Sequence, residues 1–496
     1  MSPRLRLLLA GGLGALLAVY VGVDIANESY QLGGLALLVI GWVLLEYYSA
    51  PKPDAWALAL VLLGYIVGNR GFAQFMIMPD FPLLPAEAIL MVCVPALLLR
   101  LAFQQATPFA SDGLNFSILA WMLCGTARLP LDLYRYGFDA LRDFATVYYA
   151  SFFFIAQALC RHEASRLLLR RALLYGFALL PVLSAAFSLY PDFFLTTLTW
   201  RGVPVIYYKD DLVSTFLAGG FFYFWAWREA GGSRVWLIPA AVCLLMSPTI
   251  GSPRAAMLGT ALMTAAWLLA GRTRLVAFQA GSAALVLAVM LSVFLVRKQD
   301  IRETSVYSVY EHAISIFDVT GTGEYIHNET GDPGDNNRFR LTWWRTVAEQ
   351  TLEGGPVFGL GFGADLASQF LIEYDMLGAD FSARSPHSVI MSVFGRMGTV
   401  GLVLFLFIPA MMVRETWSAF RQRNYEAMGL WSAVWTLWMS ACFGVVLEGP
   451  MGAVLFWIML GMAHDATGRN AAAPPAGAAA AALQPAEAAG EMAASP

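Results

Sequence analysis

The segment ARSPHSVIMSVFGRMGTVGL, residues 383–402, places a histidine at the start of a long apolar run. Ser385 is a typical N-cap residue and Pro386 suits the first helical position, which puts His387 in the first turn of a helix. The helix dipole disfavours a charged imidazole there, and a neutral imidazole can accept a proton as a general base. A histidine that only caps the helix at the membrane interface is the competing interpretation.

Arginines elsewhere in the chain suggest an anion-binding partner for this histidine. Arg254 follows TIGSP at the start of an apolar run, and Arg338, Arg340 and Arg345 lie within NNRFRLTWWRTVAEQ. Guanidinium groups bind phosphate in a bidentate manner, so this set predicts a site for an anionic headgroup. Snorkelling of Arg254 to the interface, and simple interface anchoring by one of the other three, are the alternatives.

Residues 338–352 have the spacing of an amphipathic helix, which we expect to lie at the outer membrane interface. Its apolar positions are Phe339, Trp343, Trp344, Val347 and Leu352. The glycine-rich stretch GGPVFGLGFG follows and ends the helix. Its amides are candidates for binding phosphate, although ordinary turn formation is the favoured interpretation.

Arg396 lies nine residues beyond His387, inside the apolar run, and needs a partner within the protein. A structural role is favoured for it. Glu448, in LEGPMG, is a candidate carboxylate partner for Arg396 at the outer edge of the membrane. It is also a candidate substrate contact.

The composition excludes an ordinary soluble domain. Of 496 residues, 58% are hydrophobic and only 13% are charged, and the mean hydropathy is +0.61. The five cysteines all lie in apolar runs without a CxxC pair, which indicates buried thiols. The remaining histidines lack metal-ligand spacing, so we expect no metal and no other cofactor, and the absence of a nucleotide motif argues against a nucleotide or nucleic-acid partner.

Hydropathy predicts an all-α polytopic membrane protein with about 12–14 transmembrane helices and one large periplasmic loop that carries amphipathic helices. The candidate spans are 5–23, which we interpret as a first anchor, 32–48, 55–69, 84–104, 115–133, 143–160, 172–190, 212–227, 235–250, 255–271, 275–296, 387–413, 428–446 and 450–464.

Arginine distribution orients these spans. Loops rich in arginine follow alternate spans and are cytoplasmic by the positive-inside rule, provided that both chain ends lie inside. The outer side then receives Arg201 in the loop 191–211, Arg254, and the whole insertion before His387. The resulting organisation is 1–190 and 191–296 as transmembrane regions, 297–386 as the periplasmic loop, 387–466 as the C-terminal helices and 467–496 as a disordered Ala/Pro-rich cytoplasmic tail.

The order of these motifs resembles the O-antigen ligase and O-antigen polymerase superfamily of bacterial envelopes. The resemblance rests on SPRAA, RLTWW, PVFGLGFG and PHS followed by GRMGTVGLVLFL, over roughly residues 195–465. It implies that Arg254, Arg340 and His387 are catalytic, with Trp344 completing an R-x-x-x-W pattern and Arg201 as a secondary contact. Arg338 is an adjacent alternative to Arg340. Ser388, where the family often has asparagine, and SPRA in place of SRG are departures.

The resemblance further implies a multi-pass protein of the bacterial inner membrane with its active site facing the periplasm. The donor would be a glycan on undecaprenyl diphosphate, and the acceptor a sugar hydroxyl of either lipid A core or a second lipid-linked repeat, with membrane lipids around both. Transfer would be metal-independent and inverting. Ligase and polymerase remain open, and a lipid-linked-glycan transporter or flippase without chemistry is the alternative from another class.

Overall fold

The computed structural model describes residues 41, 49–76, 83–103, 109–251, 253–297, 302, 305–320, 322–323, 325, 333–373 and 384–472. Within these ranges the chain is almost entirely helical, and its strands form one short hairpin, β1 (Thr199–Trp200) with β2 (Val203–Pro204). The predicted all-α class is therefore confirmed. The predicted anchor 5–23 lies outside the described residues, as does the span 32–48 except for Gly41.

Every predicted span within the described ranges coincides with a helix or a run of helices. Most ends agree within about five residues, whereas the helices at 172–190, 387–413 and 450–464 extend eight or nine residues further at one end. The N-terminal half contains α3 (Pro53–Leu63), η1 (Gly64–Gly68), α4 (Arg70–Ala73), α5 (Pro85–Phe103), α6 (Gly113–Tyr136), α7 (Phe138–Asp143), α8 (Ala145–Tyr148), α9 (Ser151–Cys160), α10 (Glu163–Leu189), η2 (Phe193–Thr197) and α11 (Asp210–Glu229). The C-terminal half contains η3 (Arg234–Trp236), α12 (Leu237–Met246), η4 (Ser247–Thr249), α13 (Arg254–Leu269), α14 (Thr273–Arg297), α15 (Ser305–Ser315), α16 (Pro333–Gly354), α17 (Ser368–Glu373), α18 (Val389–Arg421), α19 (Tyr425–Cys442) and α20 (Pro450–Ala472).

Four helical segments of the described chain are long and apolar enough to cross a membrane by length and composition. They are Gly113–Tyr136, Phe138–Cys160, Glu163–Leu189 and Val389–Arg421, and shorter apolar helices accompany them. The helical content and these segments identify a polytopic membrane protein. At the other end, α20 continues to Ala472, so the predicted tail 467–496 begins as helix, and residues 473–496 lie outside the described part.

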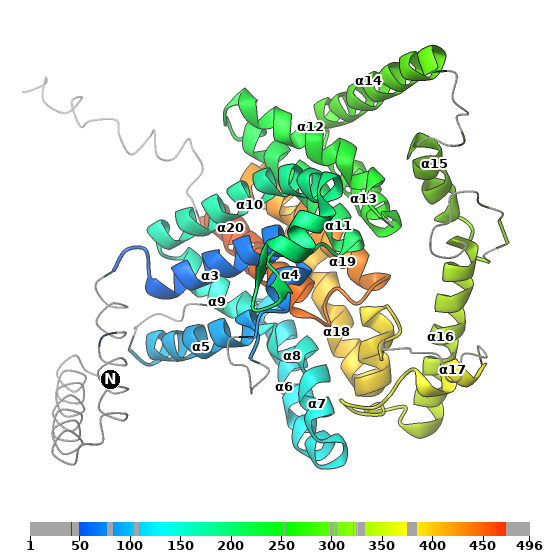
Figure 1. Ribbon diagram of the computed structural model, residues 1–496. Helices are drawn as coiled ribbons and strands as arrows, with labels where there is room; N and C mark the ends of the chain where they lie inside the picture. The colour runs from blue at the N-terminus through cyan, green and yellow to red at the C-terminus, as the bar shows by residue number, and fades with distance from the viewer. Residues whose placement is uncertain are drawn as a thin grey trace, which may run out of the picture.

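Helix α11 lies at the centre of the bundle (Figure 1). All its residues from Leu212 to Ala226 are buried, because α19, α13, α12 and α10 pack around it. A helix that is apolar on every face can be accommodated only in such a position. Helix α11 therefore runs as one buried element from one end of the bundle to the other.

Helix α18 is kinked at Gly398, whose φ of 65° and ψ of −161° are accessible to glycine only. The amides of Thr399 and Val400 do not bond to the preceding turn. They donate instead to the carbonyls of Pro356 at 2.9 Å and Val357 at 3.1 Å. The glycine-rich segment after α16 is thus inserted into the break in α18.

The carbonyls that the kink exposes are also occupied. Gly395 accepts from the amide of Leu360 at 2.7 Å, and Arg396 accepts from the amide of Gly361 at 3.1 Å. Four hydrogen bonds to the loop thereby replace two within the helix. This satisfies the requirement that buried backbone groups find partners at membrane depth.

The segment between α14 and α18 contains α15, α16 and α17, which run along one edge of the bundle (Figure 1). Trp343 and Val347 of α16 are fully buried, and Trp343 stacks on Phe370 of α17 with 4.8 Å between ring centroids. The predicted amphipathic helix therefore exists and buries this face against protein. Leu352, predicted as part of the same face, is 60% exposed.

Candidate functional site

His387 lies just before α18, in the left-handed conformation with a φ of 52°. The expectation that Ser385 caps the helix and that His387 belongs to its first turn is wrong: Ser388 is the N-cap and Val389 the first helical residue. A left-handed residue cannot continue a right-handed helix, so the imidazole is presented from a loop. Its ring packs against the Trp343 indole, with 5.7 Å between centroids.

The imidazole of His387 is surrounded by positive charge. Burial, and then Arg340 and Lys209, lower its pKa from 6.5 to about 4, while Asp211 acts in the opposite direction. His387 is therefore neutral at physiological pH. Neutrality was the expectation, but burial and neighbouring cations produce it, and the helix dipole is not the cause.

Arg340 of α16 is largely buried beside this ring. Burial, and then the neighbouring Arg254, lower its pKa to about 10, and Asp211 partly offsets both. The guanidinium remains charged at neutral pH. Its Nε is buried without a hydrogen-bond partner in the described part of the chain.

Arg254, the first residue of α13, is attached to the same helix α16. Its Nη1 donates to Oδ1 of Asn337 at 2.9 Å. The amide nitrogen of Asn337 is fixed by the carbonyls of Ser315, at 3.1 Å, and Asp318, at 2.7 Å, so its oxygen must face Arg254. The link holds Arg254 one turn away from Arg340.

Lys209 and Asp211, at the start of α11, complete the group, and the sequence analysis missed both. Lys209 Nζ lies 3.2 Å from the Asp211 carboxylate. The amide of Lys209 donates to Oδ1 of the fully buried Asn69 at 2.9 Å, which fixes the backbone. The sequence does contain a signal for them, because KDD is a charged triplet directly before the predicted span 212–227. We call Lys209, Asp211, Arg254, Arg340 and His387 the cationic cluster.

A buried polar network holds the His387 loop to the bundle. Ser385 and Ser392 share a 3.0 Å hydrogen bond, and Ser392 donates to Glu448. Glu448 also lies 3.7 Å from Arg396, whose other ion pair is with Asp143 at 3.2 Å. The predicted pairing of Arg396 with Glu448 is confirmed. Glu448 was also expected to contact substrate, but its carboxylate binds Ser392 and Arg396 in this network.

Three predicted substrate contacts do not join the cationic cluster. Arg338 is exposed, although it precedes Arg340 by only two residues. Arg345 has a side chain 79% exposed and pairs with Glu349 at 2.8 Å. Arg201 is exposed in the turn of the β1–β2 hairpin, where its guanidinium lies 5.3 Å from the Trp200 ring centroid.

The glycine-rich segment offers few free amides. Besides Leu360 and Gly361, which bond to α18, the amides of Phe362 and Gly363 donate to carboxylates, of Asp132 at 2.8 Å and Asp143 at 3.1 Å. The phosphate-binding interpretation of this stretch is wrong and its interpretation as a structural turn is correct. No group of three or more His, Cys, Asp or Glu side chains suited to a metal occurs among the described residues.

Residues 239–406 match the family model described as O-antigen ligase. The match shows that this region is similar to O-antigen ligases. The match includes Arg254, Arg340 and His387, whereas Lys209 and Asp211 precede it. The matched region is shorter than residues 195–465, over which the sequence motifs resemble the superfamily. No curated protein matches the chain. The O-antigen ligase region supports a membrane protein with a glycosyltransferase-like role.

Proposed function

We propose that the protein is a glycosyltransferase of the bacterial inner membrane that works at the periplasmic face. It transfers or polymerises a glycan from undecaprenyl diphosphate onto a sugar hydroxyl. The observation that carries the proposal is the convergence of His387, Arg340, Arg254 and Lys209, from four remote segments, at one end of the bundle. The O-antigen ligase region supports the same chemistry.

The cations of the cluster supply what the donor needs. A glycosyl diphosphate already has a good leaving group, and the reaction is accelerated by stabilising negative charge as the anomeric bond breaks. Arg340 has an unused Nε donor for this purpose, and Arg254 and Lys209 add charge beside it. These three side chains take the part that a divalent metal plays elsewhere, so transfer is metal-independent.

His387 accepts the proton of the acceptor hydroxyl. With a pKa of about 4 it is neutral but a weak base in the free protein. A bound diphosphate offsets the charges of Arg340 and Lys209, and the pKa of His387 then rises. The base is thus strengthened when the donor is in place. The hydroxyl attacks the anomeric carbon directly as the diphosphate leaves, which inverts that centre.

Two classes of acceptor fit this mechanism. Either a lipid A core sugar or the terminal sugar of a second lipid-linked repeat presents the required hydroxyl, so ligase and polymerase share this mechanism. The apolar helices around the cluster hold the polyprenyl chain. The arginine-rich loops lie at the opposite ends of the same helices, which supports a periplasmic orientation.

A transfer assay tests the proposal, with reconstituted protein, a synthetic polyprenyl-diphosphate glycan as donor and a sugar acceptor. Product with an inverted linkage is expected, with full activity in EDTA. His387→Ala should reduce transfer at least about a hundredfold, because a general base contributes 10²–10⁴. Arg345→Ala, at an exposed position on the same helix as Arg340, is the control and should retain activity. Transport of the donor without any new glycosidic bond would overturn the proposal and favour a flippase.

A further inference from the structure

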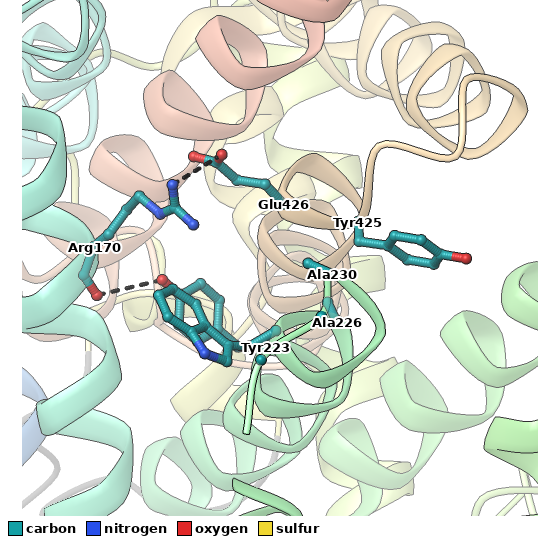
Figure 2. A pocket seen from close by; sticks show the side chains of 9 residues that line it. Arg170, Tyr223, Ala226, Ala230, Tyr425 and Glu426 are labelled. Carbon is teal, nitrogen blue, oxygen red and sulfur yellow. Dashed lines mark hydrogen bonds and ion pairs between the residues drawn. The ribbon is translucent and has the colours of Figure 1, made fainter. Parts of the chain in front are cut away.

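A cavity lies at the end of α11 that is remote from the cationic cluster. It has a volume of about 260 Å³ and is lined by Arg170, Tyr223, Ala226, Trp227, Ala230, Gly231, Gly232, Tyr425 and Glu426 (Figure 2). Lys209 and Asp211 stand at the start of α11 and the cavity at its end, so a 20-residue helix, about 30 Å long, separates them. The cavity therefore takes no part in the proposed transfer.

The cavity lining carries one guanidinium group, of Arg170, and one carboxylate, of Glu426. Glu426 is shared by two arginines, Arg170 at 3.1 Å and Arg469 at 3.3 Å. Arg469 has a second partner, Asp465, at 2.9 Å, whereas the Nε of Arg170 is buried and has no hydrogen-bond partner in the described part of the chain. The ion pair with Glu426 therefore leaves one donor of Arg170, its Nε, without an acceptor in the described part of the chain.

Aromatic rings form the other walls. The Arg170 guanidinium lies 5.1 Å from the Trp227 ring centroid, and the Tyr223 hydroxyl donates to the Arg170 carbonyl at 3.3 Å (Figure 2). Arg272 covers the Tyr425 ring at 5.1 Å, and its Nε is also buried without a partner among the described residues. Amphipathic rings beside arginines are typical of the level at which lipid headgroups meet a protein.

We propose that this cavity binds a phosphate-bearing anion, and that its arginine and aromatic walls fit the phosphodiester of an anionic phospholipid headgroup. The cavity lies at the end of α10 and α11 where the arginine-rich loops gather, which the sequence assigns to the cytoplasmic side. Anionic lipids attract basic residues at that surface. A bound headgroup would join α10, α11 and α19, which contribute the lining residues.

Native mass spectrometry of the purified full-length chain tests this with phosphatidylglycerol, phosphatidylcholine and inorganic phosphate as separate probes. The matched pair of variants is Arg170→Gln and Arg171→Gln, since Arg171 is the exposed neighbour outside the cavity. We expect the protein to retain phosphatidylglycerol in preference to phosphatidylcholine. The affinity for phosphatidylglycerol should fall about fivefold in Arg170→Gln, which is the contribution of one arginine near a lipid headgroup, and should not change in Arg171→Gln.

Ala230→Leu fills the cavity and leaves every charge in place, so it should reduce retention even where Arg170→Gln folds poorly. Binding of inorganic phosphate without phosphatidylglycerol would support the anion chemistry and assign the site to a free phosphate. Equal retention of both lipids, or equal loss in Arg170→Gln and Arg171→Gln, would overturn the proposal.

Discussion

The indole Nε1–H of Trp344 donates a 2.6 Å hydrogen bond to the carbonyl oxygen of Pro386, the residue before His387. Trp344 lies on α16, four residues after Arg340. One short bond therefore joins the helix that carries the principal cation to the loop that carries the imidazole. In the proposed reaction, the spacing between the base and the leaving-group site depends on this bond, and a displacement of about 1 Å costs rate.

Replacement of Trp344 by phenylalanine keeps an aromatic ring and removes the donor. We expect kcat of Trp344→Phe to fall about tenfold, because a hydrogen bond of this kind contributes ~1 to 1.5 kcal/mol. Initial transfer rates with lipid-linked donor measure the effect. Trp417→Phe is the matched control, since Trp417 is 55% exposed on α18. Unchanged turnover in Trp344→Phe would show that the bond does not position His387.

The pH dependence of transfer should reflect the lowered pKa of His387. The neutral imidazole is the active form, so kcat/KM, which reports the free enzyme, should stay constant down to pH about 5 and fall as pH approaches the pKa of about 4. The kcat limb should lie at higher pH, because bound diphosphate raises that pKa. Rate profiles at saturating and limiting donor separate the two. A kcat/KM limb at the ordinary value of 6.5 would contradict the assignment.

The planar set of N–H donors on the Arg340 guanidinium should contribute to transfer in addition to its positive charge. Arg340→Lys keeps a cation and loses the planar set of donors, so we expect kcat/KM for the donor to drop about a hundredfold. Arg345→Lys makes the same change on the exposed face of α16, where Arg345 pairs with Glu349, and should be neutral. Steady-state kinetics with the lipid-linked donor decide between them. Similar values for both variants would argue against a phosphate contact at Arg340.

Gly398→Ala should destabilise the fold. A Cβ at this position would lie 2.5 Å from the Val357 carbonyl oxygen and crowd the Gly359 amide, and the positive φ adds strain. We expect a loss of about 2 to 3 kcal/mol, seen as a lower melting temperature in detergent. Gly281→Ala in α14 meets no atom within 4 Å and should be neutral or slightly stabilising. Equal melting temperatures for the two variants would contradict the role assigned to the kink.

The sequence predicted the helices well because hydropathy is a local property. Helix α11 was predicted as 212–227 and spans Asp210–Glu229, and α13 was predicted as 255–271 and spans Arg254–Leu269. The positive-inside rule also assigned Arg254, Arg340 and His387 to one side, and the structure brings them together. Sidedness alone, however, cannot tell which outer arginines converge.

Helical geometry explains why two of the predicted contacts, Arg338 and Arg345, lie away from the cationic cluster. Residues two apart on a helix point about 200° apart, so Arg338 and Arg340 cannot both face the cluster. Arg345 lies five residues after Arg340, about 140° away, and four residues before Glu349, with which it pairs. Both facts were available from spacing. The left-handed conformation of His387 was not, because Ser-Pro-His reads as an ordinary helix start.

The kink at Gly398 has a consequence for membrane biogenesis. Until the glycine-rich loop docks, a broken α18 would expose bare carbonyls and amides to hydrocarbon, at several kcal/mol for each group. We therefore expect the newly made helix to partition into the bilayer as one unbroken rod. The helix then bends only when the glycine-rich loop, which is translated just before it, docks and replaces the lost hydrogen bonds. Formation of the kink therefore depends on the segment that also carries Arg340.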